Sequence, residues 1–119
     1  MSVERKTIKV MLVEPGPFRT DFAGRSIGQS REQIADYAET AGKRRSDTAA
    51  RNGNQQGDPI RAAQAIIDVI NSEKPPMHLL LGAPALTLAR KQLDMMRADF
   101  DTWEKTTLGA DYPDAVNNF

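Results

Sequence analysis

The chain has 119 residues, and its 16 basic and 16 acidic side chains cancel, so one domain is expected, with neither nucleic acid nor a membrane surface as partner. Its lack of cysteine excludes disulfides, thiolate nucleophiles and zinc–thiolate sites. No stretch approaches the ~20 apolar residues of a membrane span and the N-terminus does not resemble a signal peptide, so a cytoplasmic protein is expected.

A strand followed by a rigid turn is expected near the N-terminus. Residues 8–14, IKVMLVE, are rich in β-branched side chains and apolar without alternation. This pattern is typical of a strand that is covered on both faces in a parallel sheet. Pro15 and Gly16 follow directly, and they should end the strand because proline lacks the N–H of a sheet ladder and glycine can take a positive φ.

The middle of the chain predicts one or two marginal helices and then a loop. Residues 30–52 are compatible with helix, but their apolar stripe is narrow. Lys43, Arg44 and Arg45 form a charged patch. Such a patch could contact a phosphate, yet charges on a weak surface helix are most often only solvated. Residues 52–57, NGNQQG, have the composition of a turn-rich loop.

A helix, a strand and a second helix are expected after this loop. Asp58 can cap a helix that begins with Pro59 and continues to about residue 72. The apolar positions of this helix repeat at helical spacing: Ile60, Ala63, Ile67 and Ile70. MHLLLG, residues 77–82, predicts a short strand that ends on glycine, and apolar steps of three and four predict an amphipathic helix over residues 84–105.

This order of elements predicts an α/β fold with one right-handed crossover between two parallel strands. Two strands are too few for a free-standing parallel sheet, because each needs neighbouring strands and helices on both faces. Leu, Ile, Val and Phe make up only about a fifth of the chain, so the core should also be thin. We therefore expect part of a larger fold, or a protomer that completes its sheet with a partner.

The stretch IKVMLVEPGPFRTDF, a strand that ends in Pro-Gly with a threonine four residues after the glycine, resembles the late segment of the short-chain dehydrogenase/reductase family. The segments after it are similar, in order, to the substrate loop, the penultimate helix, the last strand and the terminal helix of that family. The resemblance covers about residues 7–105. It implies the C-terminal portion of a Rossmann-like doubly wound parallel sheet, with two strands and three or more helices.

Under this resemblance, residues 1–119 are a single partial domain with four segments. These are a strand and Pro-Gly turn at 7–22, a substrate-loop-like segment at 23–57, a helix–strand–helix at 58–105 and a tail at 106–119.

The resemblance also implies a cofactor site for NAD or NADP at the turn. Pro15 and Gly16 would shape the turn, the backbone of Phe18 would meet the nicotinamide carboxamide, and Thr20 would offer its hydroxyl to the cofactor. Arg19 has no matching role, nor has the aspartate at position 21, and both should pair locally or face solvent. No metal site is implied.

Two motifs of the family have no counterpart in the sequence, namely the glycine-rich phosphate turn TGxxxGxG and the catalytic YxxxK. Tyr37 and Tyr112 are followed four residues later by Ala41 and Val116, so neither has the lysine. We therefore assign no catalytic residue. The implied role is the C-terminal segment of an NAD(P)-dependent oxidoreductase that acts on a small carbonyl or alcohol substrate. Its missing N-terminal half would carry both motifs, so the segment should be inactive alone.

A different class of function stays open, a small non-enzymatic interaction module. Residues 9–13, KVMLV, would then pair their strand edge with a second copy of the chain or with a separate subunit. An apolar stripe that ends in Met96, Phe100 and Trp103 fits either an oligomer surface or a plain core face. His78, the one histidine, should be buried or half-buried in packing, because no carboxylate accompanies it at motif spacing. Tyr37 could stack on a substrate.

Overall fold

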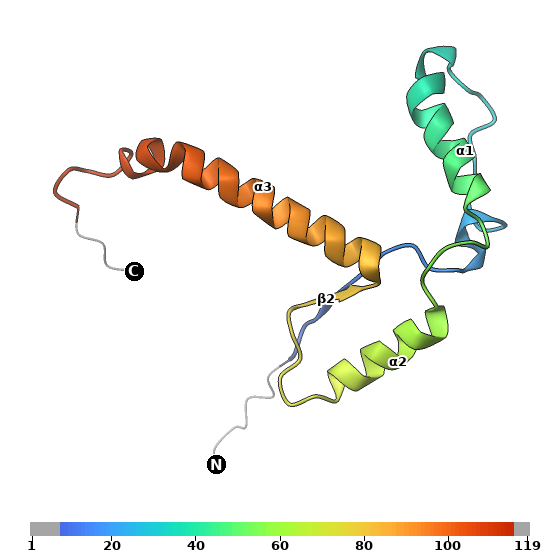
Figure 1. The fold of residues 1–119 in the computed structure, drawn as a ribbon, viewed down its shortest axis with the longest axis horizontal. Helices are drawn as coiled ribbons and strands as arrows, with labels where there is room; N and C mark the ends of the chain where they lie inside the picture. The colour runs from blue at the N-terminus through green and yellow to red at the C-terminus, as the bar shows by residue number, and fades with distance from the viewer. Residues whose placement is uncertain (1–7, 116–119) are drawn as a thin grey trace. The chain divides into compact units, whose positions relative to one another are not determined.

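The structure is a computed structural model that describes residues 8–115 (Figure 1). The chain forms two compact units, which divide between Ala85 and Leu86. The first unit contains the sheet and the turn after its first strand, and the second unit is mainly one helix.

The first unit contains a two-stranded parallel sheet. Strands β1 (Leu12–Pro15) and β2 (His78–Leu81) pair with Leu12 opposite His78 and Pro15 opposite Leu81. The predicted parallel α/β arrangement is therefore confirmed. β1 begins four residues later than predicted at Ile8, because β2 has four residues and a parallel ladder extends only as far as both strands do.

Short helical pieces follow the turn after β1. They are the 3₁₀ helices Asp21–Ala23 and Ala35–Tyr37, a π-helical turn over Ala38–Gly42, and α1 (Lys43–Ala50). None of these elements contains a buried residue. This agrees with the sequence pattern, which predicted only marginal helices because the apolar stripe is too narrow to bury a face.

Helix α2 (Pro59–Ile70) forms the crossover between the two strands (Figure 1). It begins where the sequence predicted, because Oδ1 of Asp58 accepts a hydrogen bond of 2.9 Å from the amide of Ile60. It ends two residues earlier than predicted. The face that looks toward the strands carries Ala62, Ala63 and Ile66, which line a pocket together with strand residues.

The apolar spacing predicted the helix, and Ala63 is the one of its four positions that lines this pocket. Ile60 is 81% exposed and Ile67 is 52% exposed, so the two residues lie away from the strands. Apolar side chains consequently occur on more than one face of α2, which is the pattern of a helix that is covered on several sides.

Helix α3 (Ala83–Leu108) makes up most of the second unit. It ends three residues later than the predicted residue 105. Phe100 and Trp103 are 65% and 63% exposed, so the described chain does not bury the stripe that they end. Across residues 8–115, no helix combines the length and the apolar composition that crossing a membrane requires.

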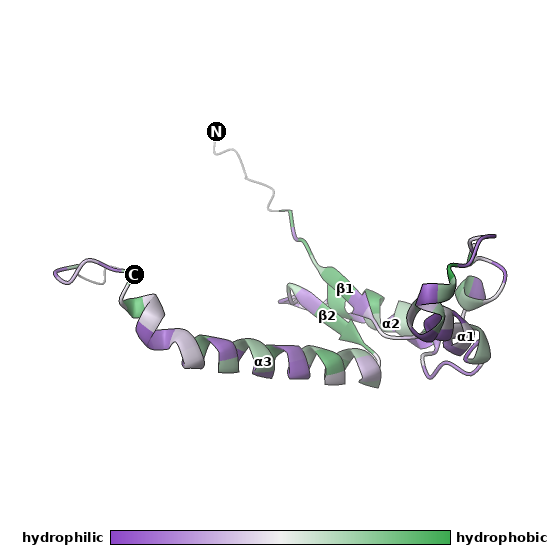
Figure 2. Cartoon of the chain, turned by 90° about the horizontal axis from the view of Figure 1, so that it is seen from above, coloured by the Kyte–Doolittle hydropathy of each residue, from purple (hydrophilic) through white to green (hydrophobic). Residues whose placement is uncertain are grey.

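The core of the described residues is as thin as the composition predicts. Leu81 is the single buried hydrophobic residue among them, with 9% of its surface exposed. Figure 2 shows both strands in the colour of hydrophobic residues, whereas α1 is largely hydrophilic. The apolar surface of the sheet is therefore present but mostly uncovered, for example at Leu12, which is 47% exposed.

Candidate functional site

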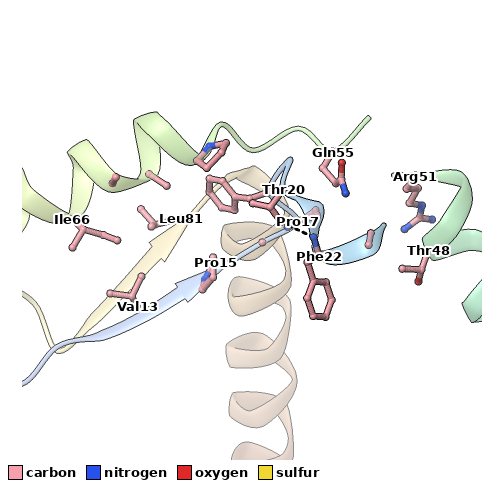
Figure 3. Close-up of a pocket in the computed structure, with 16 residues that line it drawn as sticks. Val13, Pro15, Pro17, Thr20, Phe22, Thr48, Arg51, Gln55, Ile66 and Leu81 are labelled. Atoms are coloured by element: carbon pink, nitrogen blue, oxygen red, sulfur yellow. Dashed lines mark hydrogen bonds between the residues drawn. The ribbon is translucent and has the colours of Figure 1, made fainter. Parts of the chain in front are cut away.

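A pocket of about 640 Å³ lies beside the turn that follows β1 (Figure 3). All four residues that the sequence predicted for the cofactor line it: Pro15, Gly16, Phe18 and Thr20. The fold thus brings these residues together at the carboxyl end of a parallel strand, which is where open α/β sheets bind their ligands.

The pocket is apolar at one end and polar at the other (Figure 3). The apolar end is made by side chains of the sheet and of α2: Val13, Leu81 and Ile66. The polar end is made by side chains of α1 and the loop after it: Thr48, Arg51 and Gln55. A ligand in this pocket would therefore meet chemically different surfaces at its two ends.

Gly16 is held close against the end of β2 and the start of α3. Its amide donates a 2.8 Å hydrogen bond to the carbonyl of Leu81. A Cβ at this position would lie 3.3 Å from the amide nitrogen of Ala85, which is a tight contact. The pair Pro15 and Gly16 therefore ends β1 while it keeps the chain in contact with the neighbouring strand.

Phe18 forms an isolated parallel bridge with Gly57. The amide of Gly57 donates to the carbonyl of Pro17 at 3.1 Å, and the amide of Arg19 donates to the carbonyl of Gly57 at 2.9 Å. In this pattern the N–H and C=O of Phe18 itself point away from Gly57. Among residues 8–115 they have no hydrogen-bond partner. Phe18 thus offers one donor and one acceptor.

Gly57 is a residue of the site that the sequence did not identify. A Cβ here would lie 2.5 Å from Cδ1 of Phe18 and 2.8 Å from the carbonyl oxygen of Pro17. Only a residue without a side chain permits this approach. The sequence identified Gly57 only as a loop residue before Asp58. Its partner in the bridge, Phe18, lies 39 positions earlier in the chain, so no local pattern connects the two residues.

Thr20 caps the 3₁₀ helix that follows the turn. Its Oγ1 accepts a 3.3 Å hydrogen bond from the amide of Phe22. A hydroxyl that accepts one bond can still donate its own hydrogen. Thr20 therefore has a hydrogen to offer at the pocket, in a side chain that the helix cap orients.

Arg19 and Asp21 differ in how they are used. Asp21 forms an ion pair with Arg25, which is the local pairing that the sequence predicted. Arg19 instead donates from Nη2 to the main-chain carbonyl of Gln55 at 3.0 Å. Arg19 is exposed, as one of the two expected alternatives has it, but its hydrogen bond is not local, because it joins the turn to the loop before α2.

The tyrosines contribute nothing to this pocket. Tyr37 is 56% exposed and Tyr112 is 83% exposed, and neither lines it. No group of three or more metal-binding side chains is present among residues 8–115.

His78 is exposed, contrary to the expectation of a buried or half-buried packing role. Its imidazole Nδ1 lies 2.7 Å from Oε1 of Glu14, and the two side chains are 61% and 45% exposed. The parallel register explains the pair, because His78 lies opposite Leu12 and therefore on the same face of the sheet as Glu14. Motif spacing could not indicate this carboxylate, because it is 64 positions away in the sequence.

The arginines of α1 and of its C-cap form no ion pair among residues 8–115, and one of them, Arg51, lines the pocket. Lys43 Nζ lies 2.9 Å from Oδ2 of Asp47, and this hydrogen bond and the lysine charge lower the pKa of Asp47, with a smaller contribution from Arg51. Among residues 8–115, the guanidinium of Arg51 forms no ion pair of its own. A positive charge that forms no ion pair among these residues therefore lies at the polar end of the pocket, and it interacts with Asp47 only at longer range.

The parallel strands, the crossover helix and a ligand-sized pocket at the strand end together describe part of a Rossmann-like α/β fold. The chain has a TM-score of 0.67 and 38% sequence identity to a short-chain dehydrogenase from Streptomyces avermitilis, and it is 29% identical over 103 residues to Oxidoreductase BOA17 from Botryotinia fuckeliana. The chain is thus similar in sequence and in fold to part of a short-chain dehydrogenase, and the resemblance seen in the sequence is confirmed.

The similarity covers most of this chain and a minor part of each relative. It includes 87% of this chain in both comparisons, but 36% of the Streptomyces protein and 37% of the Botryotinia protein. No family profile matches the sequence. The chain therefore spans about a third of the length of the relatives that it resembles.

Proposed function

We propose that this chain supplies the nicotinamide-side turn and the substrate loop of an NAD(P)-dependent oxidoreductase. The observation that carries the proposal is the backbone of Phe18, whose N–H and C=O are both left free by the bridge to Gly57. A nicotinamide carboxamide needs one acceptor for its N–H and one donor for its oxygen, which is what such a residue provides.

The pocket suits the nicotinamide end of the cofactor better than it suits the diphosphate end. Phe18 would hold the carboxamide, Thr20 would donate its free hydrogen, and Pro15 and Gly16 would hold the turn in place. When bound, the nicotinamide supplies or accepts the hydride. The sequence has no glycine-rich turn for the diphosphate, so we assign that part of the cofactor to another segment of the enzyme.

Catalysis in this proposal requires groups from outside the chain. No tyrosine of the sequence has a lysine four residues after it, so a proton donor and the group that lowers its pKa must come from elsewhere. A missing N-terminal half is the partner that best fits this need, and a homo-oligomer is the other candidate. The substrate would be a small carbonyl compound or alcohol.

A segment exchange with the Streptomyces avermitilis dehydrogenase tests the proposal. Residues 8–105 of this chain would replace the matching part of that protein, and NAD(P)H oxidation with carbonyl substrates would be measured by absorbance. We expect the hybrid to be active and the isolated 119-residue chain to be inactive. Turnover by the isolated chain would contradict the assignment, and so would a folded hybrid that binds no cofactor.

An interaction module is the second candidate, and the uncovered strand β1 favours it. Leu12 is 47% exposed, Val10 just before the strand is 63% exposed, and within residues 8–115 β1 pairs with β2 alone. A second strand at this edge would satisfy free backbone groups and cover apolar side chains. A defined dimer of the purified chain in analytical ultracentrifugation, with no response to NADPH, would favour the module over the oxidoreductase segment.

A further inference from the structure

We propose that the pocket beside the turn takes a substrate with an apolar body and a carboxylate at one end, and that Arg51 is the residue that selects the carboxylate. This inference rests on the proposed function, because it takes the other ligand of the pocket to be the nicotinamide. It names the substrate class that the oxidoreductase would use, an oxo or hydroxy carboxylic acid with an aliphatic chain.

The charge at Arg51 is the first support. Arg51 lines the pocket at its polar end, and within residues 8–115 no carboxylate lies in ion-pair distance of its guanidinium. The nearest acidic residue of its helix, Asp47, is hydrogen-bonded by Lys43 at 2.9 Å. Lys43 is therefore the main partner of Asp47, and Arg51 interacts with this carboxylate only as a weaker charge at longer range.

The excess positive charge of the surrounding segment strengthens this support. From Lys43 to Arg51 the sequence has four basic side chains and one carboxylate: Lys43, Arg44, Arg45 and Arg51 against Asp47. An anion that enters the pocket would be attracted by this segment as well as by Arg51 itself. The planar guanidinium can also hold a carboxylate through two parallel hydrogen bonds.

Gln55 supplies a second polar group at the same end. Its Oε1 is buried and has no hydrogen-bond partner among residues 8–115. A buried amide oxygen without a partner is costly, and a rotation of the side chain that brings this oxygen to the pocket would let a ligand hydroxyl or N–H satisfy it. The amide can also turn to present its N–H₂ to a carboxylate. Either arrangement suits a polar ligand end beside Gln55.

The opposite end of the pocket needs an apolar body. Val13 and Leu81 of the strands and Ile66 of α2 face this end and carry no polar side-chain atom (Figure 3). A volume of about 640 Å³ lies within the range of small-molecule sites, so an aliphatic chain has room beside a nicotinamide ring. A ligand with charged groups along its whole length would place some of them against these apolar side chains, where they would lose their hydration without gaining hydrogen bonds.

Binding to the full 119-residue chain tests the inference, with octanoate as the charged probe and octanol as the neutral one of equal chain length. Affinities would be measured by nitrogen-15 NMR titration. We expect octanoate to bind more tightly than octanol and to shift the Arg51 side-chain signal. Arg51→Gln should weaken octanoate about fivefold and leave octanol unchanged, since an exposed charge pair contributes a modest amount.

Two control variants separate the role of Arg51 from a general charge effect. Arg45→Gln makes the same charge change on the same helix, but Arg45 does not line this pocket. It should leave octanoate binding within about twofold of the unchanged chain. Arg51→Lys keeps the charge and should retain most of the preference for octanoate. Equal affinities for the two probes, or an equal loss in Arg45→Gln, would overturn the inference.

A parallel titration with NADPH distinguishes this inference from the proposed function. Shifts of the Phe18 and Thr20 amides on NADPH addition support the proposed function, whatever happens with octanoate. Octanoate selection by Arg51 without any NADPH response would support the inference about Arg51, and the segment exchange would then decide the cofactor role, because the diphosphate site lies outside this chain in the proposal. If Arg51→Gln instead weakens NADPH and spares octanoate, Arg51 serves the cofactor phosphates and the inference is wrong.

Discussion

The two ends of the pocket are held in place by different kinds of contact. At the turn, Gly16 is bonded to Leu81 and Phe18 forms a bridge with Gly57, so residues far apart in the sequence fix its shape. At the polar end, the hydrogen bonds of α1 join near neighbours, such as Thr48 to the carbonyl of Arg44 at 2.8 Å.

This difference indicates that the geometry of the turn is held more rigidly than that of α1. Long-range backbone contacts hold the Phe18 donor and acceptor in one geometry, which suits a ligand group that never changes, such as a carboxamide. A segment with local contacts and exposed side chains can change without loss of the sheet. We therefore expect substitutions at the turn to affect folding and cofactor recognition, and substitutions in α1 to affect the choice of substrate.

The largest effect on stability is expected at Gly57. In Gly57→Ala the new Cβ would lie 2.5 Å from the ring of Phe18, so the bridge must open or the ring must move. We expect a loss of about 2 kcal/mol in the free energy of unfolding, which is typical of overpacked sites. Urea denaturation followed by circular dichroism would measure it.

Gly28→Ala is the matched control for this substitution. No atom lies within 4 Å of a Cβ at Gly28, so its effect should stay within about 0.5 kcal/mol. Equal losses at the two glycines would show that the turn is no more tightly held than the rest of the segment, and the comparison would fail.

A small effect of pH is expected at the polar end. Lys43 lowers the pKa of Asp47 below its ordinary value of 3.8, so the folded chain binds fewer protons there than the unfolded chain. The stabilisation is present above that value and is lost as the pH falls through the lowered pKa. Because the pair is exposed, the effect on stability should be slight.

Thermal unfolding at about pH 6 and about pH 3 would detect this contribution. Asp47→Asn should lose less stability on acidification than the unchanged chain. Asp36→Asn serves as control, because Asp36 has no ion-pair partner among residues 8–115. A pH response of Asp47→Asn that matches the unchanged chain would show that the lysine contact does not form.

Local signals allowed the sequence to predict most elements. The start of α2 follows from Asp58 and Pro59, and the end of β1 at Pro15 lies within one residue of the end that Pro15 and Gly16 predicted, because caps and breakers act within a few residues. The similarity of the turn to that of a short-chain dehydrogenase was likewise readable from one short stretch.

Contacts between distant segments could not be predicted in this way. The bridge between Phe18 and Gly57, the tether from Arg19 to Gln55 and the pair of His78 with Glu14 all depend on how the crossover returns to the sheet. Periodicity predicted helix α2 but not which of its faces lies toward the strands, because apolar residues on several sides leave the orientation of a helix undetermined.

The cofactor KM of the hybrid dehydrogenase tests the central claim most directly, with Thr20→Val as the decisive variant. The substitution removes the hydroxyl that Thr20 would use to donate a hydrogen bond to the cofactor. It should raise the KM for the nicotinamide cofactor about fivefold and leave the substrate KM unchanged. Thr40→Val, whose hydroxyl bonds the carbonyl of Tyr37 away from the pocket, should change neither. An unaltered cofactor KM in Thr20→Val, in a hybrid that folds and turns over, would contradict the placement of the nicotinamide at this turn.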